Sequence, residues 1–145
     1  MANATPTTGL FFEDLTVGQS ASRRHVVSDA DIRAFAEVSG DHNPVHVDEA
    51  FAAATPFKGR IAHGMLSGAY ISALIAGELP GPGAIYISQV LNFKRPVRIN
   101  DELVTTVTIT ALDEAKGRAT LATVCTVNDK AVVEGAAVIM VPRKA

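Results

Sequence analysis

The chain has one cysteine, no tryptophan and few charged residues, and each shortage narrows what the protein can be. Cys125 has no second cysteine to pair with, so no internal disulfide staples the fold and a reducing compartment suits it. Because it stands in an alternating apolar run, we expect a buried, inert thiol. A net charge of −2 argues against nucleic acid as the principal partner.

The sequence also lacks a hydrophobic run long enough to cross a membrane. Its most apolar stretch, near residues 61–76, is interrupted by a histidine and two serines. Residues 1–9 (MANATPTTG) have neither the basic start nor the apolar core of a signal peptide. We therefore expect no membrane partner, a cytoplasmic location, a flexible tail over residues 1–10 and a single domain over residues 11–145.

Helical signals dominate the first half of the chain. Residues 20–27 are compatible with one strand, after which Ser28 is placed as an N-cap with an acidic residue three positions on. The apolar stripe that follows ends at Gly40, a residue typical of helix C-termini. Asp48 then caps a short helix that ends before Pro56. The first half thus supplies one strand and two helices.

A long helix and four strands are predicted after residue 63. The segment from residue 64 to about 79 is apolar on nearly every helical face, which is typical of a buried helix. Alternating segments rich in valine, isoleucine and threonine follow at 84–97, 102–114, 117–129 and 130–142. Tight connections between them favour antiparallel pairing. We predict an α+β fold in which this helix packs on a sheet of about five strands. Its open strand edges and helix flank favour a homodimer.

The segment SGDHNPVHVDEAFA, residues 39–52, places a carboxylate and an imidazole five positions apart. We expect Pro44 to prevent a helix here and to make the segment a bent strut. Two valines flank His46 and favour burial, so His46 should point to the opposite side. Asp41 and His46 could then hold one water molecule and act as general acid and base. The alternative is an Asx-turn aspartate and a polar loop histidine without function.

A metal site is the other reading of the same segment. His42 and His46 have the His-x-x-x-His spacing that aligns two ligands on a helix. Pro44 opposes that helix, and the sequence offers no cysteine or histidine cluster as a third ligand. We therefore expect no metal and assign His42 no role.

A second motif, RIAHGMLSG, ends at the start of the predicted long helix. Gly64 lies at its first turn, where backbone N–H groups are unpaired and the helix dipole favours negative charge, so it is a candidate oxyanion hole. The alternative is a glycine that only permits a sharp turn. Ser72 follows Met65 by seven positions on the same helical stripe and could face the same space, or bond back to a carbonyl.

Three basic residues, Lys94, Arg95 and Arg98, end the first strand of the second half. They could bind ligand phosphates, or simply form a solvated edge. The sequence has no dinucleotide fingerprint and no Gly-x-Ser-x-Gly elbow, which weakens a nucleotide-dependent or serine-hydrolase function.

From Leu15 to Pro142 the chain resembles the MaoC-type (R)-specific enoyl-CoA hydratases, small monofunctional enzymes that feed polyhydroxyalkanoate synthesis. The resemblance rests on SGDHNPVHVDEAFA, GRIAHGMLSGAYIS and GAIYISQVLNFKRPVRINDE. It implies a hot-dog fold, in which an antiparallel sheet wraps a long central helix and two copies form one continuous sheet. It also implies an acyl-CoA substrate and no separate cofactor, because coenzyme A is part of the substrate.

The resemblance also implies roles for individual residues. Asp41 and His46 are the expected catalytic pair, and the Gly64 N–H is expected to bind the thioester oxygen. Ser72 and Asn43 are expected to support the catalytic carboxylate. The phosphates of coenzyme A are expected near basic residues, for which Lys94, Arg95 and Arg98 are the candidates.

The reaction implied is the reversible syn hydration of trans-2-enoyl-CoA to (R)-3-hydroxyacyl-CoA. Three alternatives stay open from the sequence: an acyl-CoA thioesterase, a 3-hydroxyacyl-carrier-protein dehydratase, and a non-catalytic dimer that binds acyl-CoA.

Overall fold

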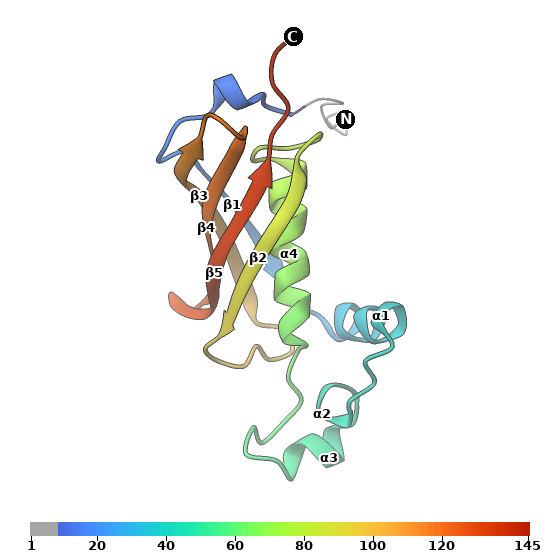
Figure 1. Cartoon of the computed structure of the whole chain (residues 1–145). Coiled ribbons are helices and arrows are strands. Elements are labelled where there is room, and N and C mark those ends of the chain that lie inside the picture. Colours follow the sequence, from blue (N-terminus) through green and yellow to red (C-terminus); the bar gives the residue numbers. More distant parts are fainter. Residues whose placement is uncertain (1–8) are drawn as a thin grey trace, which may run out of the picture.

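An antiparallel sheet curls around one long helix in the computed structural model, which describes residues 9–145 (Figure 1). The five strands are β1 (Ser20–Val26), β2 (Ile85–Phe93), β3 (Glu102–Asp113), β4 (Arg118–Val127) and β5 (Lys130–Met140). The helices are η1 (Phe12–Asp14), α1 (Asp29–Ser39), α2 (Pro44–Val47), α3 (Glu49–Ala53) and α4 (Gly64–Gly77). The expected α+β class, with one long helix on a five-stranded antiparallel sheet, is confirmed.

The strand order is β1-β3-β4-β5-β2. Strands β3, β4 and β5 therefore form a meander at the centre of the sheet. The β4–β5 turn has positive φ angles at Asn128 and Asp129, the backbone that a two-residue hairpin requires. Gly117, with φ 65°, ends the β3–β4 connection. The predicted turns therefore lie where expected. The pairing of β2 with β5 at the far edge was not predicted.

The core lies between the sheet and one side of α4. Leu66, Ile71, Leu74 and Ile75 of α4 are buried, and β3 places its alternate residues against them. The opposite side of the helix carries small apolar residues, among them Ala69, Ala73 and Ala76, which are exposed in the single chain. The apolar pattern therefore predicted the helix correctly, but only half of its surface is covered by its own sheet.

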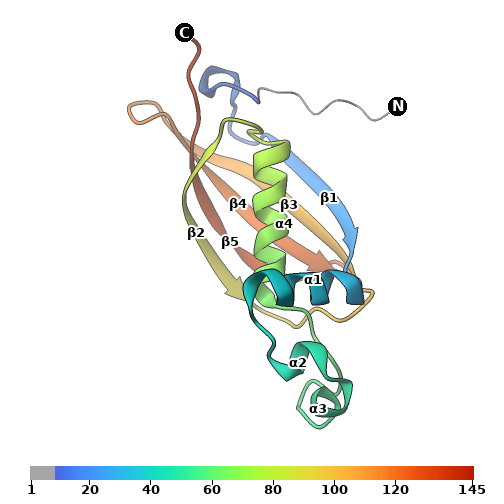
Figure 2. The ribbon, with the colours of Figure 1, turned by 90° about the vertical axis from the view of Figure 1, so that its right-hand side faces the viewer.

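The segment between β1 and α4 forms an overhang beyond the end of the sheet. Figure 2 shows α1 crossing the lower end of α4, with α2 and α3 below it. Ser28 caps α1 through a capping box with Asp31, and Gly40 ends it with φ 76°. Asp48 caps α3 through the N–H of Phe51. All three predicted helix boundaries in this segment are confirmed.

The expected strut around Pro44 is wrong. Pro44 begins the short helix α2, because a proline at the first helical position loses no hydrogen bond and already has a helical φ. Asn43, extended as expected before a proline, caps this helix through the N–H of Val45. The helical turn also reverses the expected burial, since His46 is buried while Val45 and Val47 are only half-buried.

The expected tail covers residues 1–10, of which residues 1–8 lie outside the described residues. Gly9 and Leu10 donate backbone hydrogen bonds to the carbonyls of Pro82 and Pro80, so these two residues pair with the loop after α4. The division into tail and single domain stays a prediction. Among residues 9–145, every helix is too short or too polar to span a bilayer.

Candidate active site

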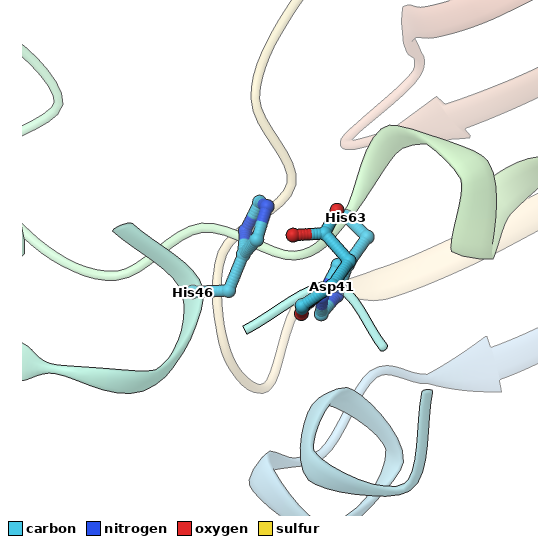
Figure 3. A group of neighbouring side chains, drawn as sticks. All are labelled: Asp41, His46 and His63. Atoms are coloured by element: carbon cyan, nitrogen blue, oxygen red, sulfur yellow. Dashed lines mark hydrogen bonds between the residues drawn. The ribbon is translucent and has the colours of Figure 1, made fainter. Parts of the chain in front are cut away.

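Asp41, His46 and His63 meet where the overhang faces the start of α4 (Figure 3). Asp41 lies in the loop between α1 and α2, His46 on α2, and His63 immediately before α4. One ring nitrogen of each histidine and one carboxylate oxygen of Asp41 all lie within 4.8 Å of one another. The sequence pattern therefore brought Asp41 and His46 together correctly, while His63 is an addition that it did not predict.

A chain of local hydrogen bonds holds the loop that carries Asp41. The Asp41 N–H donates to Ser39 Oγ, and Asp41 Oδ1 accepts from the Asn43 N–H, both at 3.1 Å. Asn43 Oδ1 in turn accepts from the Val45 N–H. Asp41 is thus an Asx-turn residue and its carboxylate is exposed beside the two imidazoles. The observed contact of Asn43 is with the start of α2, which orients the segment between Asp41 and His46.

His46 is 8% exposed, and its tautomer follows from its contacts. Nδ1 lies 2.8 Å from the carbonyl oxygen of Ile61, which can only accept, so Nδ1 is the donor. The neutral ring then carries its lone pair on Nε2. Burial lowers the pKa of His46 below 6.5, and the positive charge of His63 acts in the same direction, while the Ile61 hydrogen bond and Asp41 oppose it.

His63 is 2% exposed and contacts both partners. Its Nε2 donates to the backbone oxygen of Asp41 at 2.9 Å. Its ring stacks on that of His46 with centroids 3.9 Å apart, and the ring of Phe35 meets it edge-on at 4.9 Å. The sequence did contain a signal for His63. It directly precedes a strongly apolar helix, where a polar side chain is expected to be buried.

Gly64 is the first residue of α4, so its N–H has no partner within the helix. A Cβ at this position would lie 2.6 Å from the Phe93 ring, so any side chain here would require that ring to move. The glycine is therefore needed for this close approach as well as for access to its N–H. A cavity of about 450 Å³ opens beside it, and Phe57, Met65 and Phe93 form apolar parts of the wall.

Two of the three predicted basic residues line this cavity. Lys94 and Arg95 are at its wall, Lys94 paired with Glu134 at 3.5 Å and Arg95 donating to the Ala131 carbonyl. Arg98 does not line it: its guanidinium donates to the Phe57 carbonyl and holds the turn before α4. The sequence pattern did not distinguish the two residues that line the cavity, Lys94 and Arg95, from Arg98, which supports the turn.

Ser72 does not contact Asp41 in the single chain. It lies eight residues beyond Gly64, about 12 Å along the helix axis, and it is half-buried. Among residues 9–145 its hydroxyl makes no hydrogen bond to the carboxylate or to either histidine. The supporting role of Ser72 stays a prediction, because the geometry of a single chain shows no contact through which it would act on Asp41.

The two imidazoles are poorly placed to share a metal ion, although the cluster has the composition of a metal site. Ring lone pairs lie in the ring plane, and the planes of His46 and His63 are stacked at 28°, so the lone pairs run side by side instead of converging. His42 is exposed and faces Glu37, away from the cluster. The expectation of a metal-free site stays a prediction.

Comparison with known proteins identifies close relatives. A MaoC-like domain model matches residues 14–133. An (R)-specific enoyl-CoA hydratase of Rhodospirillum rubrum is 53% identical over 134 residues, 92% of this chain and 93% of that protein.

Two solved structures have the same fold. The R-hydratase PhaJ1 of Pseudomonas aeruginosa, in its unliganded form, has a TM-score of 0.89 at 47% identity, covering 94% of this chain and 88% of that one. The (R)-hydratase of A. caviae, described as involved in PHA biosynthesis, has a TM-score of 0.87 at 44% identity, covering 90% and 99%. With a curled sheet around α4 and an acid–imidazole pair at its N-terminus, this chain has the hot-dog fold and belongs to the MaoC-like domain family.

Proposed function

We propose that the protein is an (R)-specific enoyl-CoA hydratase, which adds water reversibly to trans-2-enoyl-CoA and forms (R)-3-hydroxyacyl-CoA. The observation that carries the proposal is the approach of Asp41 and His46 to within 4.8 Å, next to a cavity that reaches the Gly64 N–H. The similarity to hydratases over nine-tenths of the chain supports the same activity.

The spacing of the pair suits one shared water molecule. Two acceptors of a single water lie about 4.5 Å apart when each hydrogen bond is about 2.8 Å long and the angle at the water is tetrahedral. A carboxylate oxygen of Asp41 and a ring nitrogen of His46 lie no more than 4.8 Å apart, which is compatible with this spacing. His46 offers an Nε2 lone pair because its Nδ1–H is committed to Ile61, and Asp41 offers acceptor oxygens only. The pair can therefore take a proton from water and return one.

The reaction follows from this geometry. Water attacks C3 of the enoyl thioester, the catalytic dyad formed by Asp41 and His46 takes one proton of the water, and a proton is delivered to C2. Both events occur on the face turned to the dyad, so the addition is syn and gives a single enantiomer. Negative charge develops on the thioester oxygen, where the Gly64 N–H and the α4 dipole stabilise it, a contribution of about 3 kcal/mol for one such donor.

The rest of the substrate fits the cavity beside Gly64. The walls formed by Phe57, Met65 and Phe93 suit the apolar parts of an acyl-pantetheine chain. Lys94 and Arg95 at the same cavity suit the phosphates of coenzyme A. The dyad supplies the acid–base chemistry, so the reaction requires no separate cofactor. A thioesterase, whose water attacks C1, would use the same Gly64 contact, so the similarity to hydratases is what favours addition at C3.

The working unit that we propose is a homodimer joined along β2. This strand is a sheet edge, and Ile85, Ile87 and Val90 on it are 40–56% exposed. The uncovered side of α4, with Ala69 and Ala73, is a second exposed apolar surface. Exposed apolar edges of this kind are normally covered by another chain.

The cellular setting that we propose is the cytoplasm, where the product would supply polyhydroxyalkanoate synthesis. The A. caviae relative, described as involved in PHA biosynthesis, supports this role. Assays with crotonyl-CoA and with the same acyl group on a carrier protein would test the choice of carrier.

Loss of either member of the dyad should abolish most of the hydration. Asp41→Asn and His46→Ala should each lower kcat/KM for crotonyl-CoA by at least about 100-fold, since each removes a positioned acid or base. Absorbance at the enoyl thioester band and chiral analysis of the product measure this. His42→Ala, an exposed histidine in the same segment, is the control and should keep the wild-type rate. Near-normal hydration by either dyad variant contradicts the mechanism.

The acid limb of the pH profile should lie below pH 6.5. His46 must be neutral to accept a proton at Nε2. Because burial lowers its pKa, the ring becomes protonated only at a lower pH than an exposed histidine does. The same shift affects folding: the stabilisation from a neutral His46 is complete above about pH 6.5 and is lost as the pH falls. Measurement of kcat/KM between pH 5 and 8 tests this, and a limb above 6.5 contradicts it.

Substitution of a basic side chain at the cavity wall should weaken the binding of coenzyme A thioesters specifically. Lys94→Gln and Arg95→Gln should each raise KM for crotonyl-CoA about 3- to 10-fold, because exposed ionic contacts contribute about 1 kcal/mol. Crotonyl-pantetheine, which has no nucleotide phosphates, should show no such change. Lys116→Gln, in the β3–β4 turn, is the control. Equal effects on both substrates would exclude a phosphate contact.

In solution the protein should have twice its 15.2 kDa chain mass. A variant with Val90→Lys and Ala73→Lys should dissociate to monomers, because it charges both exposed apolar surfaces. The control is Val38→Lys, a valine on α1 that is 83% exposed and outside these surfaces, which should remain dimeric. Light scattering after size exclusion measures the mass. A monomeric wild-type protein contradicts the proposed dimer.

A further inference from the structure

His63 is a buried titratable residue that the proposed mechanism does not use. It contacts two elements of the site at once, the backbone of Asp41 through Nε2 and the ring of His46 by stacking. Its own backbone leads directly into Gly64. One side chain therefore lies beside the carboxylate and the imidazole (Figure 3), and it directly precedes the proposed oxyanion donor in sequence.

The stability of the fold does not explain a histidine at this position. Because Nε2 is the donor, Nδ1 carries a lone pair, and within residues 9–145 this buried atom has no hydrogen-bond partner. An unpartnered buried acceptor is unfavourable and rare in folded proteins. The Phe35 ring meets the His63 ring edge-on at 4.9 Å, a contact that a phenyl group at position 63 would keep. Packing alone therefore does not account for the unpartnered nitrogen, which points to a function.

We propose that His63 is a positioning residue of the hydratase, which fixes the Asp41 loop and the plane of the His46 ring through one hydrogen bond and one stack. The inference rests on the proposed function. The hydrogen bond restrains the Asp41 backbone, whose carboxylate is otherwise exposed. The stack leaves His46 one orientation, with Nδ1 at the Ile61 carbonyl and Nε2 free.

The stack has an electrostatic consequence as well. The groups that face His46 are Asp41, His63 and the Arg60 guanidinium, which donates to the His46 carbonyl at 2.7 Å. Burial is the main reason why the pKa of His46 is low, and the electrostatic effect of the stacked His63 lowers it further. Both effects favour the neutral His46 ring, which is the form that accepts a proton.

Two substitutions separate the hydrogen bond from the stack. His63→Gln keeps an N–H donor for the Asp41 carbonyl and loses the ring, whereas His63→Phe keeps a stacking ring and loses the donor. We expect His63→Phe to lower kcat for crotonyl-CoA at least 10-fold with KM changed less than 3-fold. His63→Gln should recover part of that loss. In both variants the acid limb of the profile should move to higher pH, because the lowering effect of His63 on the pKa of His46 is removed.

Thermal unfolding distinguishes positioning from simple support of the fold. His63→Phe removes both an unpartnered buried acceptor and the hydrogen bond to the Asp41 carbonyl, and these effects offset each other, so its unfolding midpoint should stay close to that of the wild type while its activity falls. A residue needed only for the fold would show the reverse, a lower midpoint with a normal rate in the folded fraction. The control is His42→Gln, which should change neither the midpoint nor the rate.

A measurement on the wild-type protein needs no variant. Two-bond ¹H–¹⁵N correlation spectra at pH 8 should show His63 as the Nε2–H tautomer and His46 as the Nδ1–H tautomer. The opposite tautomer at His63 overturns the proposal, as does wild-type activity in both His63 variants. A wild-type protein that leaves crotonyl-CoA unchanged refutes the proposed function instead, and the spectra still decide the geometry of His63.

Discussion

The guanidinium of Arg60 holds the overhang in place, and the site depends on it. Arg60 comes just before α4, and its side chain is only 9% exposed. It donates to the His46 carbonyl at 2.7 Å and to Asp29, in the first turn of α1, at 2.5 Å. The overhang has few buried apolar residues, namely Val27, Ile32, Ala36, Ala52 and Ala62, so a charge-assisted bond of this kind is an important restraint on its position. The carboxylate and the imidazole are therefore held against α4 by polar contacts in addition to a small number of core contacts.

The two sides of the site differ in how they are built. The side that carries Asp41 and His46 consists of successive capped turns, each fixed by a side-chain hydrogen bond to a backbone N–H. The side that carries Gly64 is the N-terminus of the regular helix α4, and the glycine lies against the Phe93 ring of β2. The proposed reaction needs both properties: precise acid–base groups over the substrate and a fixed N–H donor beneath it.

Local signals in the sequence were sufficient for the elements and insufficient for their long-range contacts. Ser28, Gly40 and Asp48 act as caps because capping depends on neighbours three or four residues away. The edge position of β2 depends on residues about 50 positions distant and could not be read from periodicity. Pro44 was misjudged because a proline that begins a helix and a proline that prevents one look alike in sequence. His63 was missed as a member of the site because only the fold stacks it on His46.

The order of strands in the sheet bears on how the chain reaches this state. The central strands β3, β4 and β5 are joined by tight turns, while Ser20 of β1 pairs with Thr108, 88 residues away. Contacts between distant segments form slowly because closing a long loop costs chain entropy. We therefore expect the meander to collapse early and the two outer strands to dock afterwards. Because the overhang lies between those outer strands in sequence, we expect its catalytic groups to become ordered late in refolding.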